Sequence, residues 1–110
     1  MKNFKMRFTP EASRLLSKLH PENKKQIKQA LQALQKDPYN GSDLQEELYG
    51  FKSLKQKRYR ILYNINEEDA FIQIFHIGHR RDVYEQFRRL LNELHNSSSP
   101  DPPAAENQTG

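Results

Sequence analysis

Residues able to act on a phosphodiester lie at the two ends of one stretch of the chain, residues 58–84. Arg60 is near the start of this stretch, and His79, Arg80 and Tyr84 are at its end. Guanidinium groups can offset the negative charge that builds on phosphorus during cleavage. Imidazole and phenol groups can transfer the protons. These residue types indicate RNA cleavage by the substrate's own 2′-hydroxyl, a reaction that needs no metal and no other cofactor.

The candidate residues can meet only if this stretch folds back on itself. Residues 59–66 alternate in polarity, with Ile61 and its neighbours two apart on one face, and residues 70–77 are apolar on both faces. The pattern predicts two strands joined by a short acidic turn at residues 67–69. In an antiparallel hairpin the far ends of the strands lie side by side, so Arg60 is expected beside the end of the second strand.

Further basic residues surround this group and are candidates for binding an RNA backbone. They are Lys52, Lys55, Lys57, Arg58 and Arg81. Because side chains alternate along a strand, they must divide between two faces, and we expect Lys52 and Arg58 to share the open face with Arg60. A solvated strand edge, where lysines discourage edge-to-edge pairing, would have the same pattern.

The histidines at positions 76 and 79 do not indicate a metal site. The chain has no cysteine, and no acidic residue has ligand spacing relative to them. We predict His76 to be a hydrogen-bonded strand residue. His79 follows a glycine at a strand end, where a functional imidazole is plausible, and no metal is expected.

The composition favours a single basic domain. Residues 96–110 contain two acidic and no basic residues, so residues 1–95 hold 18 basic and 14 − 2 = 12 acidic residues, a net charge of +6. Such a charge favours a polyanionic or acidic partner. Residues 96–110 have no large apolar side chain and three prolines, and we predict a disordered tail.

Cysteine use and hydropathy bear on the compartment. The absence of cysteine fits a reducing cytoplasm. No apolar run approaches the roughly 20 residues of a membrane span, and no signal peptide is visible. We therefore expect a cytoplasmic protein that does not enter membranes.

The other elements predict an α+β fold. Period-two alternation at residues 4–9 predicts a first strand, and prolines at positions 10 and 21 open two helices with apolar stripes. Residues 44–50 read as an irregular lead-in to a strand at 51–56, and a last helix begins near Val83. The expected architecture has the order β-α-α-β-β-β-α. It is an antiparallel sheet of about four strands, with the helical hairpin on one face and the last helix near the edge of the other.

Two segments carry a resemblance to a known family. They are LYGFKSLKQKRYRILY at residues 48–63 and IFHIGHRRDVYE at residues 74–85, preceded by the two-helix start. Together they resemble the RelE/ParE superfamily of toxins from bacterial type II toxin–antitoxin systems. The resemblance covers residues 3–94. It implies a microbial RNase-like fold with a curved antiparallel sheet, and a neutralising antitoxin protein as partner.

The resemblance also implies roles for individual residues. In the RelE branch the toxin enters the ribosomal A site and cleaves the messenger RNA there. Arg60 and Arg80 match the two arginines of that branch, which would stabilise the phosphate. Tyr84 matches its tyrosine, which would orient a base or transfer a proton. His79 stands where some members use a catalytic histidine.

One departure leaves the general base open. The RelE branch has two lysines on the strand before the arginine, where this chain has Phe51 and Ser53. Lys52 and Lys55 are nearby but out of that register. Glu46 is another candidate, because a related branch uses a glutamate.

Two other functions share the predicted fold. A ParE-like toxin would inhibit DNA gyrase without RNA chemistry, and a non-catalytic module would only bind nucleic acid. The combination of Arg60, Arg80 and Tyr84 favours the nuclease, because a protein that only binds does not need it.

Overall fold

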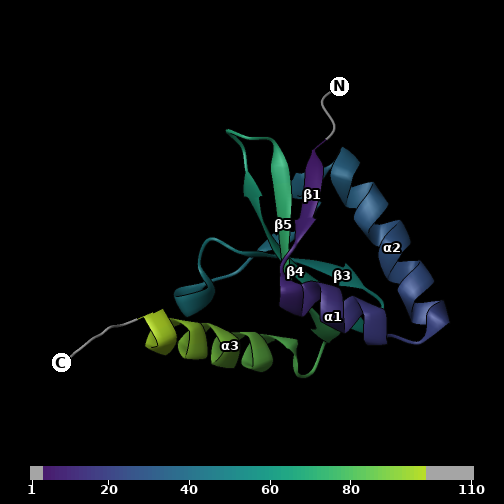
Figure 1. Cartoon of the computed structure of the whole chain (residues 1–110). Helices are drawn as coiled ribbons and strands as arrows, with labels where there is room; N and C mark the ends of the chain where they lie inside the picture. Colours follow the sequence, from purple (N-terminus) through teal and green to yellow (C-terminus); the bar gives the residue numbers. More distant parts are fainter. Residues whose placement is uncertain (1–3, 99–110) are drawn as a thin grey trace.

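The computed structural model describes residues 4–98 of the chain, with side chains up to residue 94. The elements are β1 (Lys5–Phe8), α1 (Pro10–Lys18), α2 (Pro21–Lys36), η1 (Pro38–Asn40), β2 (Ser42–Asp43), η2 (Glu46–Leu48), β3 (Lys52–Gln56), β4 (Tyr59–Asn66), β5 (Phe71–His79) and α3 (Val83–Ser98). The five strands form one sheet in the order β1-β5-β4-β3-β2. Figure 1 shows α1 and α2 as consecutive helices joined by a short connection, with α3 lying near α1. The predicted α+β class is confirmed.

The sheet differs from the prediction at its two edges. It has five strands because the two-residue β2 pairs with β3, in a segment with the composition of a turn. At the other edge β1 runs parallel to β5, whereas all other neighbours are antiparallel. β1 pairs with the edge of β5 that the hairpin with β4 leaves free. Local alternation predicts that β1 is a strand but carries no information on its partner or direction.

Both faces of the central strands are buried. On one face, α1 and α2 cover a core built around Ile61, Tyr63 and Ile74. On the other face, Leu62 packs with Phe87 and Val83 of α3 and with Leu48 of η2. Each fully buried aliphatic side chain contributes roughly 1.5–3 kcal/mol. The second face is therefore covered by α3 at its centre and is open only around it.

A β-bulge in the hairpin makes this two-sided burial possible. Leu62 pairs with His76, but the next residue, Tyr63, pairs with Ile74, so Phe75 is an extra residue on β5. The insertion turns Ile74 toward the helical hairpin and leaves Phe75 and His76 on the face of α3. Phe75 there contacts the rings of Phe51 and Phe87.

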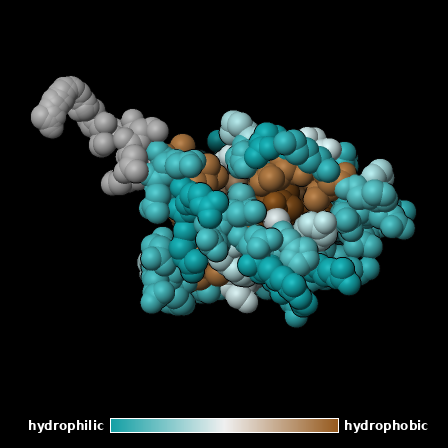
Figure 2. All heavy atoms as spheres, turned by 90° about the horizontal axis from the view of Figure 1, so that it is seen from below, coloured by the Kyte–Doolittle hydropathy of each residue, from teal (hydrophilic) through white to brown (hydrophobic). Residues whose placement is uncertain are grey.

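The outer surface is largely hydrophilic. Figure 2, which views the molecule from below, shows hydrophobic side chains in a hollow that hydrophilic side chains surround. Among residues 4–98, no helix has both the length and the apolar character required to cross a lipid bilayer. Helix α3 runs to Ser98, past the predicted domain boundary at residue 95, and the rest of the predicted tail, residues 99–110, lies outside the described residues.

A buried tyrosine joins the sheet to the loop that carries β2. Tyr63 is fully buried, and its hydroxyl donates to the Pro38 carbonyl at 2.7 Å and accepts from the Gly41 amide at 3.1 Å. A Cβ on Gly41 would lie 2.4 Å from this hydroxyl oxygen, so only glycine fits there. Burial raises the pKa of Tyr63 to about 12.

We expect Tyr63→Phe to lower the free energy of unfolding by about 1–3 kcal/mol, because two buried backbone groups lose their partner. Urea unfolding at neutral pH measures this. The control is Tyr49→Phe, since Tyr49 is 81% exposed. Equal stability of the two variants would contradict the assignment.

The same hydroxyl predicts a pH dependence. The pKa of Tyr63 rises from 10.0 to about 12 on folding, so the neutral phenol is favoured in the folded state. Its contribution to stability is complete below pH 10 and is lost as the pH rises through about 12. Unfolding curves across this window should fall more steeply for the wild type than for Tyr63→Phe.

Candidate nucleic-acid interface

The ends of β4 and β5 meet, as the hairpin pattern predicts. In the strand register Arg60 lies opposite Gly78, and Tyr59 lies opposite His79. The backbone amide of Arg80 continues the pairing, because it donates to the Arg58 carbonyl at 2.6 Å. Residues about 20 positions apart in the chain are thus neighbours at one end of the sheet.

One group of candidate residues occupies the face of α3. Lys55 on β3 lies directly opposite Arg60 on β4, and Ser53 lies opposite Leu62, so all these side chains share one face. Tyr84, on the first turn of α3, reaches the same face, and its hydroxyl lies 3.0 Å from Ser53 Oγ. Two cations and a phenol therefore border the uncovered part of this face.

Backbone carbonyls orient the Arg60 side chain. Its Nη1 donates to the Tyr59 carbonyl at 2.9 Å and to the Lys57 carbonyl at 3.0 Å. Lys57 has a φ of 53°, in the left-handed region, which makes the tight turn between β3 and β4. The guanidinium is thus held at the turn and keeps its other donors for a ligand.

A second group lies at the end of the sheet. A hollow of about 260 Å³ is lined by Arg58, His79, Arg80 and Arg81. His79 Nδ1 accepts from the Arg81 amide at 3.3 Å, and its ring packs edge-on against Tyr59, with the centroids 6.1 Å apart. Because Tyr59 faces the helical hairpin, the His79 ring lies on the side of the sheet away from Tyr84.

The charges at this end of the sheet are not neutralised. The ion pairs among residues 4–94 involve other basic residues: Arg14, Lys52, Arg88 and Arg89. Within that part of the chain no carboxylate lies at ion-pair distance from Lys55, Lys57, Arg58, Arg60, Arg80 or Arg81. Six cations without a carboxylate partner, gathered at one end of the sheet, give a field that attracts a polyanion.

Lys52 does not join this cluster, and the expectation that it shares the open face was wrong. Lys52 lies opposite Tyr63 in the register and so faces the helical hairpin. Its Nζ is 2.6 Å from Asp43 Oδ1 and lies over the Tyr39 ring. Lys55, which the sequence left out of register, is the lysine that lies beside Arg60.

The acidic candidate lies at a separate element. Glu46 is exposed on η2 with a φ of 56°, and its neighbour Glu47 pairs with Arg88 at 3.3 Å.

Sequence reasoning also missed a residue of the site, Ser53. Ser53 was noted only where a lysine was expected, yet it contacts Tyr84. Its spacing, two residues before Lys55 on the same face, was the available signal.

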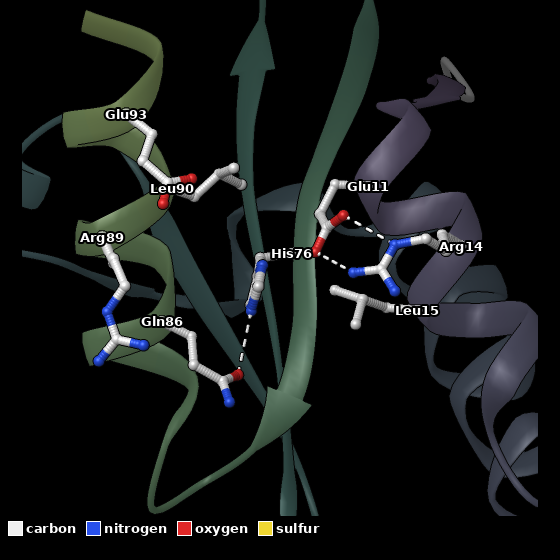
Figure 3. A pocket seen from close by; sticks show the side chains of 8 residues that line it. All are labelled: Glu11, Arg14, Leu15, His76, Gln86, Arg89, Leu90 and Glu93. Carbon is white, nitrogen blue, oxygen red and sulfur yellow. Dashed lines mark hydrogen bonds and ion pairs between the residues drawn. The ribbon is translucent and has the colours of Figure 1, made fainter. Parts of the chain in front are cut away.

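His76 lies in a separate pocket between α1 and α3 (Figure 3). It is a residue of strand β5, as predicted, and is only 3% exposed. Its Nε2 lies 3.4 Å from Gln86 Oε1, but its Nδ1 has no hydrogen-bond partner among the described residues. The charged residues around the pocket are Glu11, Arg14, Arg89 and Glu93. Burial lowers the pKa of His76 below its ordinary value of 6.5.

This lowered pKa predicts acid sensitivity. The folded state favours neutral His76, so its contribution to stability is complete above pH 6.5 and is lost as the pH falls toward the lowered pKa. Thermal unfolding between pH 7.5 and about 5 should show a smaller decrease for His76→Gln than for the wild type. Gln29, exposed on α2, provides the control, and Gln29→Ala should follow the wild type. Parallel curves for His76→Gln and the wild type would contradict the assignment.

Comparison with known proteins supports the same fold and class. The family model described as ParE toxin of type II toxin–antitoxin system, parDE, matches residues 6–84. Toxin RelG of Mycobacterium tuberculosis is 34% identical over 85 residues, which cover 76% of this chain and 98% of the relative.

Solved structures agree. The toxin–antitoxin complex RelBE2 from M. tuberculosis contains a chain with 33% identity and a TM-score of 0.68; the match covers 72% of this chain and all of that one. The isolated Escherichia coli RelE toxin has a TM-score of 0.62 at 16% identity, covering 83% of this chain and 98% of that one, which shows a shared fold.

The fold, the basic sheet end and these matches define the class, a toxin of a type II toxin–antitoxin system. Within that class, the chain belongs to the RelE/ParE toxin family, with a RelE-like fold.

Proposed function

We propose that this protein is a ribosome-dependent messenger RNA endonuclease that cleaves by attack of the 2′-hydroxyl and uses no metal. The observation that carries the proposal is that Arg60 and the Tyr84 phenol share one face of the sheet, next to the strand end where Arg80 lines a basic hollow. Action on ribosomes would require the protein to be in the cytoplasm.

Three residues would carry the reaction. Arg60 and Arg80 would bind the non-bridging oxygens of the scissile phosphate and offset the charge that develops there. The 2′-oxygen forms a bond to phosphorus as the bond to the 5′-oxygen breaks, which yields a cyclic phosphate and a free 5′-hydroxyl. Tyr84 would stack on the adjacent base or pass a proton to the leaving oxygen.

Other residues would hold the RNA strand. Lys57, Arg58 and Arg81 would contact phosphates that flank the cleaved bond, since they surround the same end of the sheet. Lys55 is directly opposite Arg60, which makes it a candidate for the general base as well as for binding. The His79 ring lies on the side of the sheet away from Tyr84, so His79 would contact a flanking part of the RNA strand rather than the phosphate beside Tyr84.

An antitoxin is the expected protein partner. The relative in RelBE2 was solved as a toxin–antitoxin complex. By analogy, an antitoxin of this protein would present acidic side chains to the six unpaired cations. Raised salt should weaken such a complex.

The first test of the proposed function is Arg80→Ala. We expect it to slow messenger cleavage about 100-fold, since it removes one group that offsets charge on the phosphate. Cleavage of a defined messenger on purified ribosomes, mapped by primer extension, measures the rate. The matched control is Arg88→Ala, because Arg88 is exposed on α3 and already pairs with Glu47. Full cleavage by both Arg80→Ala and Tyr84→Phe would refute the site.

A second candidate function is inhibition of DNA gyrase, favoured by the match to the ParE family model. A supercoiling assay distinguishes the two. We expect gyrase activity to be unchanged at protein concentrations that cleave messenger RNA completely. Gyrase inhibition without cleavage would replace the endonuclease proposal with the ParE-like one. RNA binding without either effect would indicate a non-catalytic module.

A further inference from the structure

Ser53 occupies an unusual place for a hydroxyl group. It lies on β3 opposite Leu62, and only 7% of its surface is exposed. The neighbouring side chains on this face belong to the apolar cluster of Leu48, Leu62, Val83 and Phe87. A buried hydroxyl without a hydrogen bond costs about 1–3 kcal/mol, so alanine would suit this position better unless the hydroxyl has a specific partner.

That partner is the Tyr84 phenol. Ser53 Oγ and the Tyr84 hydroxyl are 3.0 Å apart, and either oxygen can be the donor. The Tyr84 ring packs against the same apolar cluster, which limits its tilt, while the hydrogen bond determines where the phenol oxygen lies. Ser53 thus connects the first turn of α3 to the middle of β3.

The bond holds the phenol near the arginine. Residues two apart on one strand face lie about 7 Å apart, and Ser53 is two residues before Lys55, which is opposite Arg60. The phenol oxygen, bonded to Ser53, is therefore held two residues along the strand from the Lys55–Arg60 pair. If Ser53 donates, the phenol keeps its own proton for a substrate oxygen and becomes a better donor.

We propose that Ser53 is a positioning residue that fixes the Tyr84 phenol beside Arg60 for RNA cleavage. The inference rests on the proposed endonuclease function. It gives a role to Ser53, which stands where the family resemblance leads us to expect a lysine. Ser53 does not touch the RNA. It acts only through the Tyr84 hydroxyl.

A double-mutant cycle tests this role with the full-length protein. Single-turnover cleavage of messenger on ribosomes is measured for the wild type, Ser53→Ala, Tyr84→Phe and the double variant. We expect Ser53→Ala to slow cleavage about 10-fold in the wild type and less than about 2-fold when Tyr84 is already Phe. The ribosome concentration at half-maximal rate should change little, because positioning affects the chemical step.

Two further variants and a stability measurement exclude other causes. Ser53→Cys keeps the size of the side chain but forms only weak hydrogen bonds, so it should show a similar loss. Ser42→Ala, at an exposed serine of β2, should cleave like the wild type. Thermal unfolding of every variant checks that the loss of rate is not a loss of fold.

The outcomes are distinct. Wild-type cleavage by Ser53→Ala or Ser53→Cys would overturn the inference and leave the endonuclease function intact. So would an equal loss in the Tyr84→Phe background, because Ser53 would then act independently of the phenol. Absence of cleavage by the wild type would instead refute the proposed function, and the inference with it.

Discussion

The pairing of β4 with β5 is the constraint on which the candidate site depends. It brings Arg60 next to Gly78 and allows the Arg80 amide to bond to the Arg58 carbonyl. At Phe75 the bulge adds one residue to β5, which changes the face that the following side chains occupy while the two strands stay paired. A slip of one residue would turn Arg60 toward the helical hairpin and Ile61 toward α3, so the buried core and the cationic site are fixed by the same register.

Burial on both faces of the sheet gives the site its rigid support. Hydrophobic cores above and below β4 hold the strand ends, and the polar groups inside them have identifiable partners. The Tyr63 hydroxyl bonds to two backbone groups, and Ser53 bonds to Tyr84. His76 is the exception, with one ring nitrogen without a partner among the described residues. Its burial is a source of instability in acid.

Among residues 4–94, four basic side chains pair with carboxylates, and the others, on α2 as well as at the end of the sheet, do not. Arg14, Arg88 and Arg89 pair with nearby carboxylates on exposed helix surfaces, where such pairs contribute little. The cations at the end of the sheet lack such partners within the described residues. This arrangement gains nothing for folding, since like charges repel, and it is consistent with a surface that binds a polyanion.

The sequence by itself determined the α+β class, the helices, the hairpin and the meeting of Arg60 with residues 78–80, because local periodicity and a short turn specify them. Only the tertiary structure decided which face each lysine occupies. Residues 70–77 are apolar on both faces, so alternation could not reveal the bulge. The register of β3 against β4 places Lys52 on the face of the helical hairpin and Lys55 on the face of α3. The parallel partner of β1 and the contact of Ser53 with Tyr84 join segments distant in the chain, and long-range pairing leaves no local pattern.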